Sequence, residues 1–94
     1  MKKKLSFDKN INSNIVLCKT TSTHAGKMTT KQLMEDSIPF SKSYQRIPFF
    51  LRERFRGASE ICIISINRNE YARARRSLDC LDLRIRRRLR LNVI

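Results

Sequence analysis

Residues 61–66 read Ile-Cys-Ile-Ile-Ser-Ile, and this stretch gives the strongest indication of the fold. The run is short and rich in β-branched side chains, and it is followed by the turn-forming residues Asn67 and Asn69, which is typical of a buried strand. Either asparagine is a suitable N-cap, and Glu70 would then lie beside the positive end of a helix dipole. The sequence therefore predicts a strand over 61–66 followed by a helix over 70–80.

The segment 81–93 carries an alternation of apolar and charged residues that is typical of a half-buried strand. One continuous helix is the alternative, because apolar residues from Tyr71 to Leu89 also recur at spacings of three and four. We favour the strand, with Asp82 and four arginines on its polar face: Arg84, Arg86, Arg88 and Arg90. The strand over 61–66, the helix and this last strand would then form a C-terminal β-α-β unit, with a right-handed crossover if its strands are parallel.

The residues before this unit are expected to form short elements. In chain order these are a strand over 14–18, a loop over 19–27 and helices over 30–36, 41–47 and 49–56. Aromatic side chains bury large areas, so we expect the core here, from Phe40, Tyr44, Phe49, Phe50 and Phe55. The prediction is one small α+β domain over 15–94, with short helices in the middle and the β-α-β unit at its end, after a flexible Lys-rich arm over 1–14.

The composition limits the class of protein. The chain has 94 residues, of which 40% are apolar, and this suits one small domain. No apolar run exceeds four residues, so no membrane span is expected. The residues after the N-terminal lysines are too polar for a signal peptide, and we expect a cytoplasmic protein. Its three cysteines lack the spacing of zinc ligands, so we expect buried, reduced thiols and no metal or other cofactor.

The charge is large, positive and unevenly distributed. Lys and Arg number 21 against 8 Asp and Glu, a net charge of +13. Every lysine lies at or before Lys42 and every arginine at or after Arg46, and residues 71–94 hold eight arginines and two aspartates. Arginine pairs with phosphate through a planar fork, whereas lysine acts as a point charge. The only histidine, His24, has no evident partner for catalysis, so we expect a binding protein and not an enzyme.

The C-terminal arginines predict contact with DNA or RNA. Like charges this close together are unfavourable unless solvent or a polyanion screens them. Alternate residues of a strand are spaced roughly 6.5–7 Å apart, which is comparable to the repeat of nucleic-acid phosphates. A solvated basic face without a partner is one alternative, and an anionic membrane surface is another that we favour less, because the chain has no Trp. The expected contact residues are Arg73, Arg75, Arg76, Arg84, Arg86, Arg87, Arg88 and Arg90, with Lys42 and Arg46.

Lys42 and Arg46 enter this set through a local resemblance. Residues 29–33, Thr-Thr-Lys-Gln-Leu, and residues 38–46, Ile-Pro-Phe-Ser-Lys-Ser-Tyr-Gln-Arg, together resemble the helix-turn-helix of small phage and plasmid regulators of the excisionase type. The resemblance implies a second helix capped by Ser41 that lies in the major groove of DNA, with Lys42, Ser43, Gln45 and Arg46 toward the bases. It also implies a regulatory or accessory protein of a phage or mobile element. An ordinary pair of packed helices is the alternative interpretation.

A protein partner is the second function considered. The chain would then inhibit or modulate a host nucleic-acid-processing protein, with the apolar row of the last strand as its interface. If that row is exposed, it also predicts a homodimer. The row consists of Leu81, Leu83, Ile85, Leu89 and Leu91.

Overall fold

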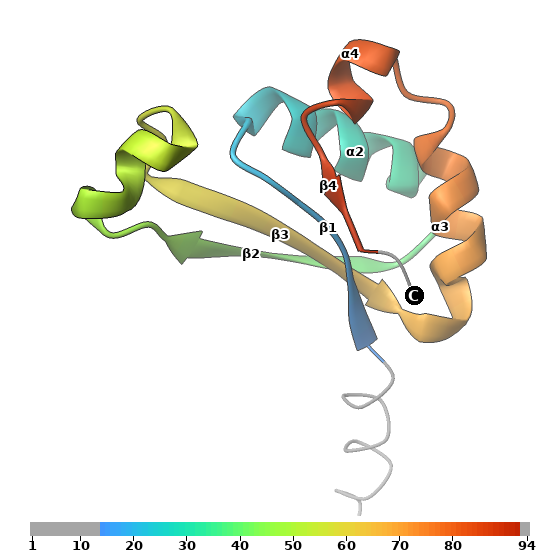
Figure 1. Cartoon of the computed structure of the whole chain (residues 1–94). Helices are drawn as coiled ribbons and strands as arrows, with labels where there is room; N and C mark the ends of the chain where they lie inside the picture. Colours follow the sequence, from blue (N-terminus) through green and yellow to red (C-terminus); the bar gives the residue numbers. More distant parts are fainter. Residues whose placement is uncertain (1–13, 93–94) are drawn as a thin grey trace, which may run out of the picture.

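A four-stranded antiparallel sheet organises residues 14–92, the part of the chain that the computed structural model describes (Figure 1). The strands are β1 (Asn14–Thr20), β2 (Phe40–Arg46), β3 (Glu60–Asn67) and β4 (Arg90–Leu91), and their order in the sheet is β2-β3-β1-β4. The domain is therefore of mixed α+β class, as predicted. The Lys-rich arm predicted over 1–14 lies outside the described residues except for Asn14, the first residue of β1.

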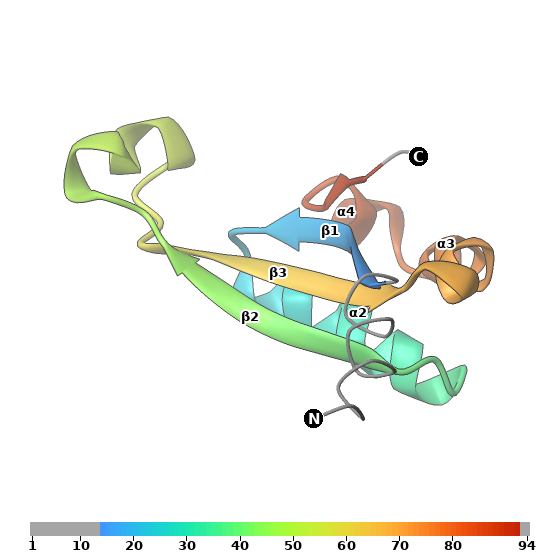
Figure 2. The ribbon, with the colours of Figure 1, turned by 90° about the horizontal axis from the view of Figure 1, so that it is seen from below.

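Two helices cover one face of this sheet. They are α2 (Thr23–Glu35) and α3 (Tyr71–Leu78), and in Figure 2 the sheet lies in front with α2 behind it. The core lies between these helices and β1 and β3, and its fully buried members include Leu17, Leu33, Ile64 and Ala74. Among residues 14–92, no helix lies on the opposite face of the sheet (Figures 1 and 2).

The strand over 61–66 and the helix that follows it are confirmed. Along β3, Cys62, Ile64 and Ile66 are buried toward the helices, while Ile61 and Ile63 are half-buried on the other face. A short 3-10 turn, η2 (Arg68–Glu70), joins β3 to α3, and the side chain of Asn67 accepts a hydrogen bond of 2.8 Å from the Asn69 N–H. The predicted strand over 14–18 is also confirmed, as β1.

The helix α2 begins earlier than predicted. The hydroxyl of Ser22 caps it by accepting a hydrogen bond of 3.1 Å from the Ala25 N–H, so most of the loop expected over 19–27 is helical. Thr29 does not cap the helix, because it lies inside it and its hydroxyl donates to the Ala25 carbonyl at 2.8 Å. A buried hydroxyl satisfied in this way is tolerated within a helix.

The helix predicted over 41–47 is wrong, because these residues form the edge strand β2 and the first residue of the turn after it. Each residue of β2 pairs with a residue of β3, from Phe40 opposite Ile66 to Arg46 opposite Glu60. The predicted recognition helix of a helix-turn-helix is therefore a strand. Ser41 could cap a helix, but pairing with the buried strand β3 keeps this segment extended. The tendency of a residue to adopt a β-strand depends on its neighbours in the tertiary structure.

The strand predicted over 81–93 is wrong for most of its length. Residues Leu83–Arg86 form a short helix, α4, and only Arg90 and Leu91 pair with β1. The side chain of Asp82 accepts a hydrogen bond of 3.0 Å from the Arg84 N–H, which favours the helical turn. Because β1 lies between β3 and β4 in the sheet, the order β3-α3-β4 forms a split unit and not a pair of neighbouring strands.

The predicted aromatic core is wrong for all of its residues except Phe40, which is half-buried and packs against the core. Strands β2 and β3 extend beyond β1 as a hairpin whose tip is the 3-10 helix η1 (Phe49–Phe55), coloured yellow-green in Figure 1. Phe49 and Phe50 are 78% and 69% exposed at this tip, and Tyr44 is also exposed. Gly57, with a φ of 83°, ends the tip, and such an angle favours glycine. The buried hydrophobic residues of the described core are aliphatic side chains and cysteines, and Phe40 and Tyr71 are partly buried against them.

The three cysteines are free thiols in two environments. Cys18 and Cys62 are buried in the core, as predicted, whereas Cys80 is exposed. Burial raises the pKa of the Cys18 thiol to about 12, with a further contribution from the neighbouring Cys62. Burial also raises the pKa of Cys62. These two thiols serve as small apolar groups.

Candidate nucleic-acid interface

Two of the three arginines of α3, Arg73 and Arg75, contact groups of the chain itself. Arg73 forms an ion pair of 2.5 Å with Glu70 and donates a hydrogen bond of 3.0 Å to the Asp36 carbonyl. Arg75 donates to the Tyr71 hydroxyl at 2.6 Å, and its guanidinium lies 5.6 Å from the centre of the Tyr71 ring. Both arginines therefore have structural partners, which leaves them less available to an external anion.

Asp36 links the end of α2 to α3. Its carboxylate accepts hydrogen bonds from the Ser77 hydroxyl and from the Gln32 amide. These two hydrogen bonds, in that order, lower the pKa of Asp36, and the positive charge of Arg73 lowers it further against the opposing effect of desolvation. The contact is structural, since Ser77 is itself buried.

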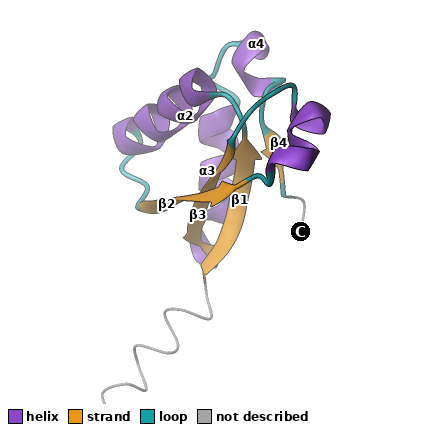
Figure 3. Cartoon of the chain, turned by 90° about the vertical axis from the view of Figure 1, so that its left-hand side faces the viewer, coloured by secondary structure: helices purple, strands orange, loops and turns teal. Residues whose placement is uncertain are grey.

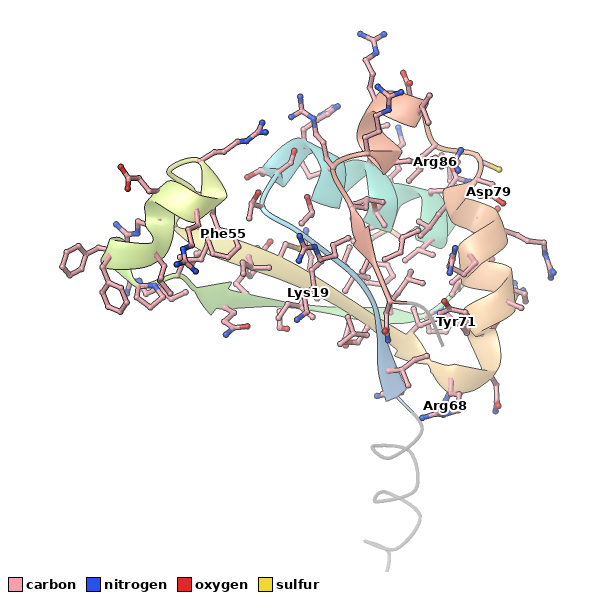
Figure 4. All side chains as sticks on the ribbon, viewed as in Figure 1. Lys19, Phe55, Arg68, Tyr71, Asp79 and Arg86 are labelled. Atoms are coloured by element: carbon pink, nitrogen blue, oxygen red, sulfur yellow. The ribbon has the colours of Figure 1, made fainter. Side chains whose placement is uncertain are left out.

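Two arginines of α4 lie near aspartates. Arg84 is 4.0 Å from Asp82 and its side chain is 88% exposed, while Arg86 is 3.7 Å from Asp79 (Figure 4). Ion pairs at such distances on a surface contribute little to stability. The acidic groups nevertheless reduce the net positive charge around α4.

Of the four C-terminal arginines that remain, Arg87, Arg88 and Arg90 lie at one open hollow of about 620 Å³. The fourth, Arg76 on α3, is exposed and does not line this hollow. We call this concavity the basic hollow, and it is lined by Lys19, Thr20, Thr21, Phe55, Ile61, Arg87, Arg88, Leu89 and Arg90. Four of these residues are cationic and none is acidic. Within residues 14–92, the guanidinium groups of Arg87, Arg88 and Arg90 form no ion pair. This is the part of the described surface where unpaired positive charge gathers around a concavity.

Two cations of the basic hollow face each other across a pair of strands. Lys19 on β1 and Arg90 on β4 are directly opposed in the antiparallel register, and both are exposed. Directly opposed like charges destabilise a strand pair. The predicted single row of Arg84, Arg86, Arg88 and Arg90 does not form, because the helical turn of α4 changes the direction of the chain.

Three hydrogen bonds accepted by main-chain carbonyls hold the C-terminal segment in place, two of them with β1 and one with α3. The Thr20 hydroxyl donates to the Arg88 carbonyl at 2.8 Å. The Asn92 side-chain amide donates to the Val16 carbonyl at 2.8 Å, and the Tyr71 hydroxyl donates to the Asn92 carbonyl at 2.5 Å. The backbone that carries the three arginines is therefore anchored at both ends, by Thr20 and by Asn92.

The hairpin tip supplies an apolar part of the basic hollow. In Figure 4, Phe55 lies on the side of the tip that faces β1, where Lys19 is found. Figure 3 views this end of the molecule, with η1, β1 and β4 grouped together. Phe55 and Ile61 are half-buried, so each presents part of an apolar surface between cationic groups. The sequence gives no signal that Lys19, Phe55 and Ile61 lie near the C-terminal arginines. These three residues belong to three separate elements, β1, η1 and β3.

A second hollow of about 360 Å³ adjoins the first along β1 and β4. It shares Lys19 and Arg90 with the basic hollow and is completed by Val16, Leu91 and Asn92. Lys19 and Arg90 therefore border both hollows.

The two residues proposed from the local resemblance lie elsewhere. Lys42 and Arg46 belong to β2, at the edge of the sheet opposite β4. Lys42 lies 5.9 Å from the centre of the Tyr44 ring, and Arg46 lies opposite Glu60 on β3. The structure therefore does not bring them together with the C-terminal arginines.

Between residues 14 and 92, no group of three or more His, Cys, Asp or Glu side chains is placed to hold a metal ion. None of the described helices is long and apolar enough to cross a membrane. No protein-family model matches the sequence, and neither curated proteins nor solved structures give a significant match to it.

Proposed function

We propose that the chain binds nucleic acid at the basic hollow, chiefly through phosphate groups. The observation that carries the proposal is the gathering of Lys19, Arg87, Arg88 and Arg90 around one concavity whose lining has no acidic residue. Each cation that neutralises a phosphate releases condensed counterions, which supplies sequence-independent affinity.

The opposed pair Lys19 and Arg90 supports an anionic ligand in particular. The two residues lie on paired strands, and main-chain hydrogen bonds on both sides of Arg90 limit the movement of its backbone. A phosphate between their side chains would replace a like-charge contact with two charge-assisted hydrogen bonds. The free energy of binding would thus include relief of a repulsion that is present in the unbound protein.

Salt dependence tests this proposal, with a control of matched charge. One variant changes Arg87, Arg88 and Arg90 to Gln, and the control changes three exposed cations that line neither hollow, Lys31, Arg68 and Arg76, to Gln. The logarithm of the binding constant should fall linearly with the logarithm of salt concentration, by about 0.7–0.9 per phosphate contact. We expect the first variant to reduce the slope by about 2–3 and the control to keep most of it. Equal slopes in the two variants would contradict the assignment of the surface.

The alternative function, binding to a protein, has one observation in its favour. Phe49 and Phe50 form an exposed edge-to-face pair with ring centres 5.8 Å apart. The apolar row predicted for this role is not available as one surface, because Leu81 is buried and Ile85, Leu89 and Leu91 pack against the core. A partner bound after nuclease treatment and at high salt, and lost from a Phe49→Ser, Phe50→Ser variant, would support this alternative over nucleic acid.

A further inference from the structure

We infer that the basic hollow selects single-stranded nucleic acid, with an unpaired base against Phe55 and the adjoining phosphates at the cationic rim. This inference rests on the proposed function and names the form of nucleic acid that the same site takes. Four observations carry it: the apolar part of the lining, the size of the hollow, the second hollow beside it along β1 and β4, and the anchored backbone of the arginine segment.

The first observation is that an aromatic ring lies among the cations. Phe55 comes from the hairpin tip and Ile61 from β3, and both line the hollow that Arg87, Arg88 and Arg90 border. A purely electrostatic contact with duplex phosphates does not require an aromatic side chain in the lining. Single-strand sites combine a positively charged groove with aromatic side chains on which bases stack.

The second observation is the size and shape of the site. A hollow of about 620 Å³ lies within the usual range for sites of small ligands, about 300–1,000 Å³, which leaves room for a nucleotide. The bases of a duplex are stacked on one another and present only their edges in the grooves. An aromatic ring in the lining of a hollow reaches the face of a base only when that base is unpaired.

The third observation is that the site continues beyond one nucleotide. The adjoining hollow of about 360 Å³ shares Lys19 and Arg90 with the first and leads along β1 toward Val16 and Asn92. An extended backbone would cross from one hollow to the other at Lys19 and Arg90. These two cations are then placed for the phosphate between successive nucleotides.

The fourth observation is that the rim is anchored before any ligand binds. The Thr20 hydroxyl holds the carbonyl of Arg88, and Asn92 is held by hydrogen bonds to Val16, Leu17 and Tyr71. Ordering a loop on binding costs conformational entropy. Little of that cost falls on the backbone that carries Arg90.

The experiment measures the affinity of the full-length protein for labelled probes of about 12 nucleotides. The probes are single-stranded oligo-dT, oligo-rU, a duplex of equal phosphate number, and an abasic strand that has the backbone without bases. We expect oligo-dT or oligo-rU to bind at least about fivefold more tightly than the abasic strand and the duplex. This comparison needs no variant, so it does not depend on how substitutions affect folding.

Variants of the hairpin tip then locate the base. Phe55→Ala should weaken binding of the preferred strand about 5- to 100-fold while leaving binding of the abasic strand and the salt slope unchanged. Phe55→Tyr should bind like the natural protein, and Phe49→Ala serves as a control outside the hollow. Circular dichroism establishes that each variant is folded.

The outcomes separate this inference from the proposed function. If none of the probes binds in dilute buffer, the proposed function itself is overturned. If the duplex or the abasic strand binds as tightly as the single strands, or if folded Phe55→Ala binds like the natural protein, selection of single strands is overturned. Nucleic-acid binding at the arginines would still stand in those two cases.

Discussion

The Thr20 hydroxyl donates a hydrogen bond of 2.8 Å to the Arg88 carbonyl, and so joins two residues that are 68 positions apart in the sequence. The same oxygen accepts a hydrogen bond of 3.0 Å from the Ser22 N–H, next to the start of α2. Thr20 is buried, so one side chain fixes both the entry to α2 and the position of the arginine segment. Stability and the geometry of the basic hollow are thereby linked.

Replacement of Thr20 by Val should affect both properties. The shape of the side chain is preserved, but the Ser22 N–H and the Arg88 carbonyl lose their partner, and we expect the free energy of unfolding to fall by about 1–3 kcal/mol. Affinity for nucleic acid should decrease with no change in net charge and little change in the salt slope. Denaturant titration and salt-dependent binding measure the two effects. Thr20→Ser, which keeps the hydroxyl, is the control, and equal stability of the Val and Ser variants would contradict the role of the hydrogen bond.

Core and tip residues should differ sharply in their contribution to stability. Ile64 is fully buried beneath the helices, whereas Phe50 is 69% exposed on the hairpin tip. We expect Ile64→Ala to lower the free energy of unfolding by about 2–5 kcal/mol and Phe50→Ala to change it by less than about 0.5 kcal/mol. Urea unfolding followed by circular dichroism measures both. A large loss of stability in Phe50→Ala would mean that the tip packs on the domain.

Asp36 should make stability depend on pH in the acid range. The hydrogen bonds from Ser77 and Gln32 lower its pKa in the folded protein below the ordinary value of 3.8. Its contribution to stability is therefore present at pH values above 3.8 and is lost as the pH falls through the lower, folded pKa. Asp36→Asn should lose less stability than the natural protein when the pH is lowered from about 6 to about 3.

Urea unfolding at a series of pH values gives the comparison for Asp36. Ser77→Ala removes the largest cause of the shift, so its pH dependence should lie between those of the natural protein and Asp36→Asn. If the three proteins lose stability in parallel, the contact between α2 and α3 does not act through the carboxylate.

The thiols should react with a colorimetric thiol reagent at two different rates. Cys80 is exposed, whereas Cys18 and Cys62 are buried and have raised pKa values. Only the thiolate is nucleophilic, so at about pH 8 the native protein should show one rapidly reacting thiol and two that react only on unfolding. Cys80→Ser should remove the rapid phase. Rapid reaction of all three thiols in the native protein would show that the core opens readily.

The local sequence pattern predicted an element correctly where the spacing of its apolar residues favoured only one type of secondary structure. The run of residues 61–66 is a strand because its β-branched side chains suit a pleated surface between two neighbours, and α3 follows a turn capped by Asn67. The strand β2 was not predictable in this way, since its residues are almost all exposed and only their pairing with β3 makes them extended. Phe49, Phe50 and Phe55 lie on the hairpin tip and not in the core, and this placement depends on how far β2 and β3 project beyond β1.

The candidate site likewise has some features that the sequence predicted and others that depend on the tertiary structure. Composition alone indicated a polyanionic partner, and the density of arginine after Tyr71 indicated which end of the chain carries much of the charge. Only the tertiary structure shows that Arg73 and Arg75 contact side chains of the domain, whereas Arg87, Arg88 and Arg90 form no ion pair among the described residues. Lys19 lies opposite Arg90 only because β4 pairs with β1. Charge and hydropathy are properties of single residues and short windows, so the sequence determines them. Which charges share a surface depends on contacts between distant segments, and the packing of β1, β4 and the hairpin decides it.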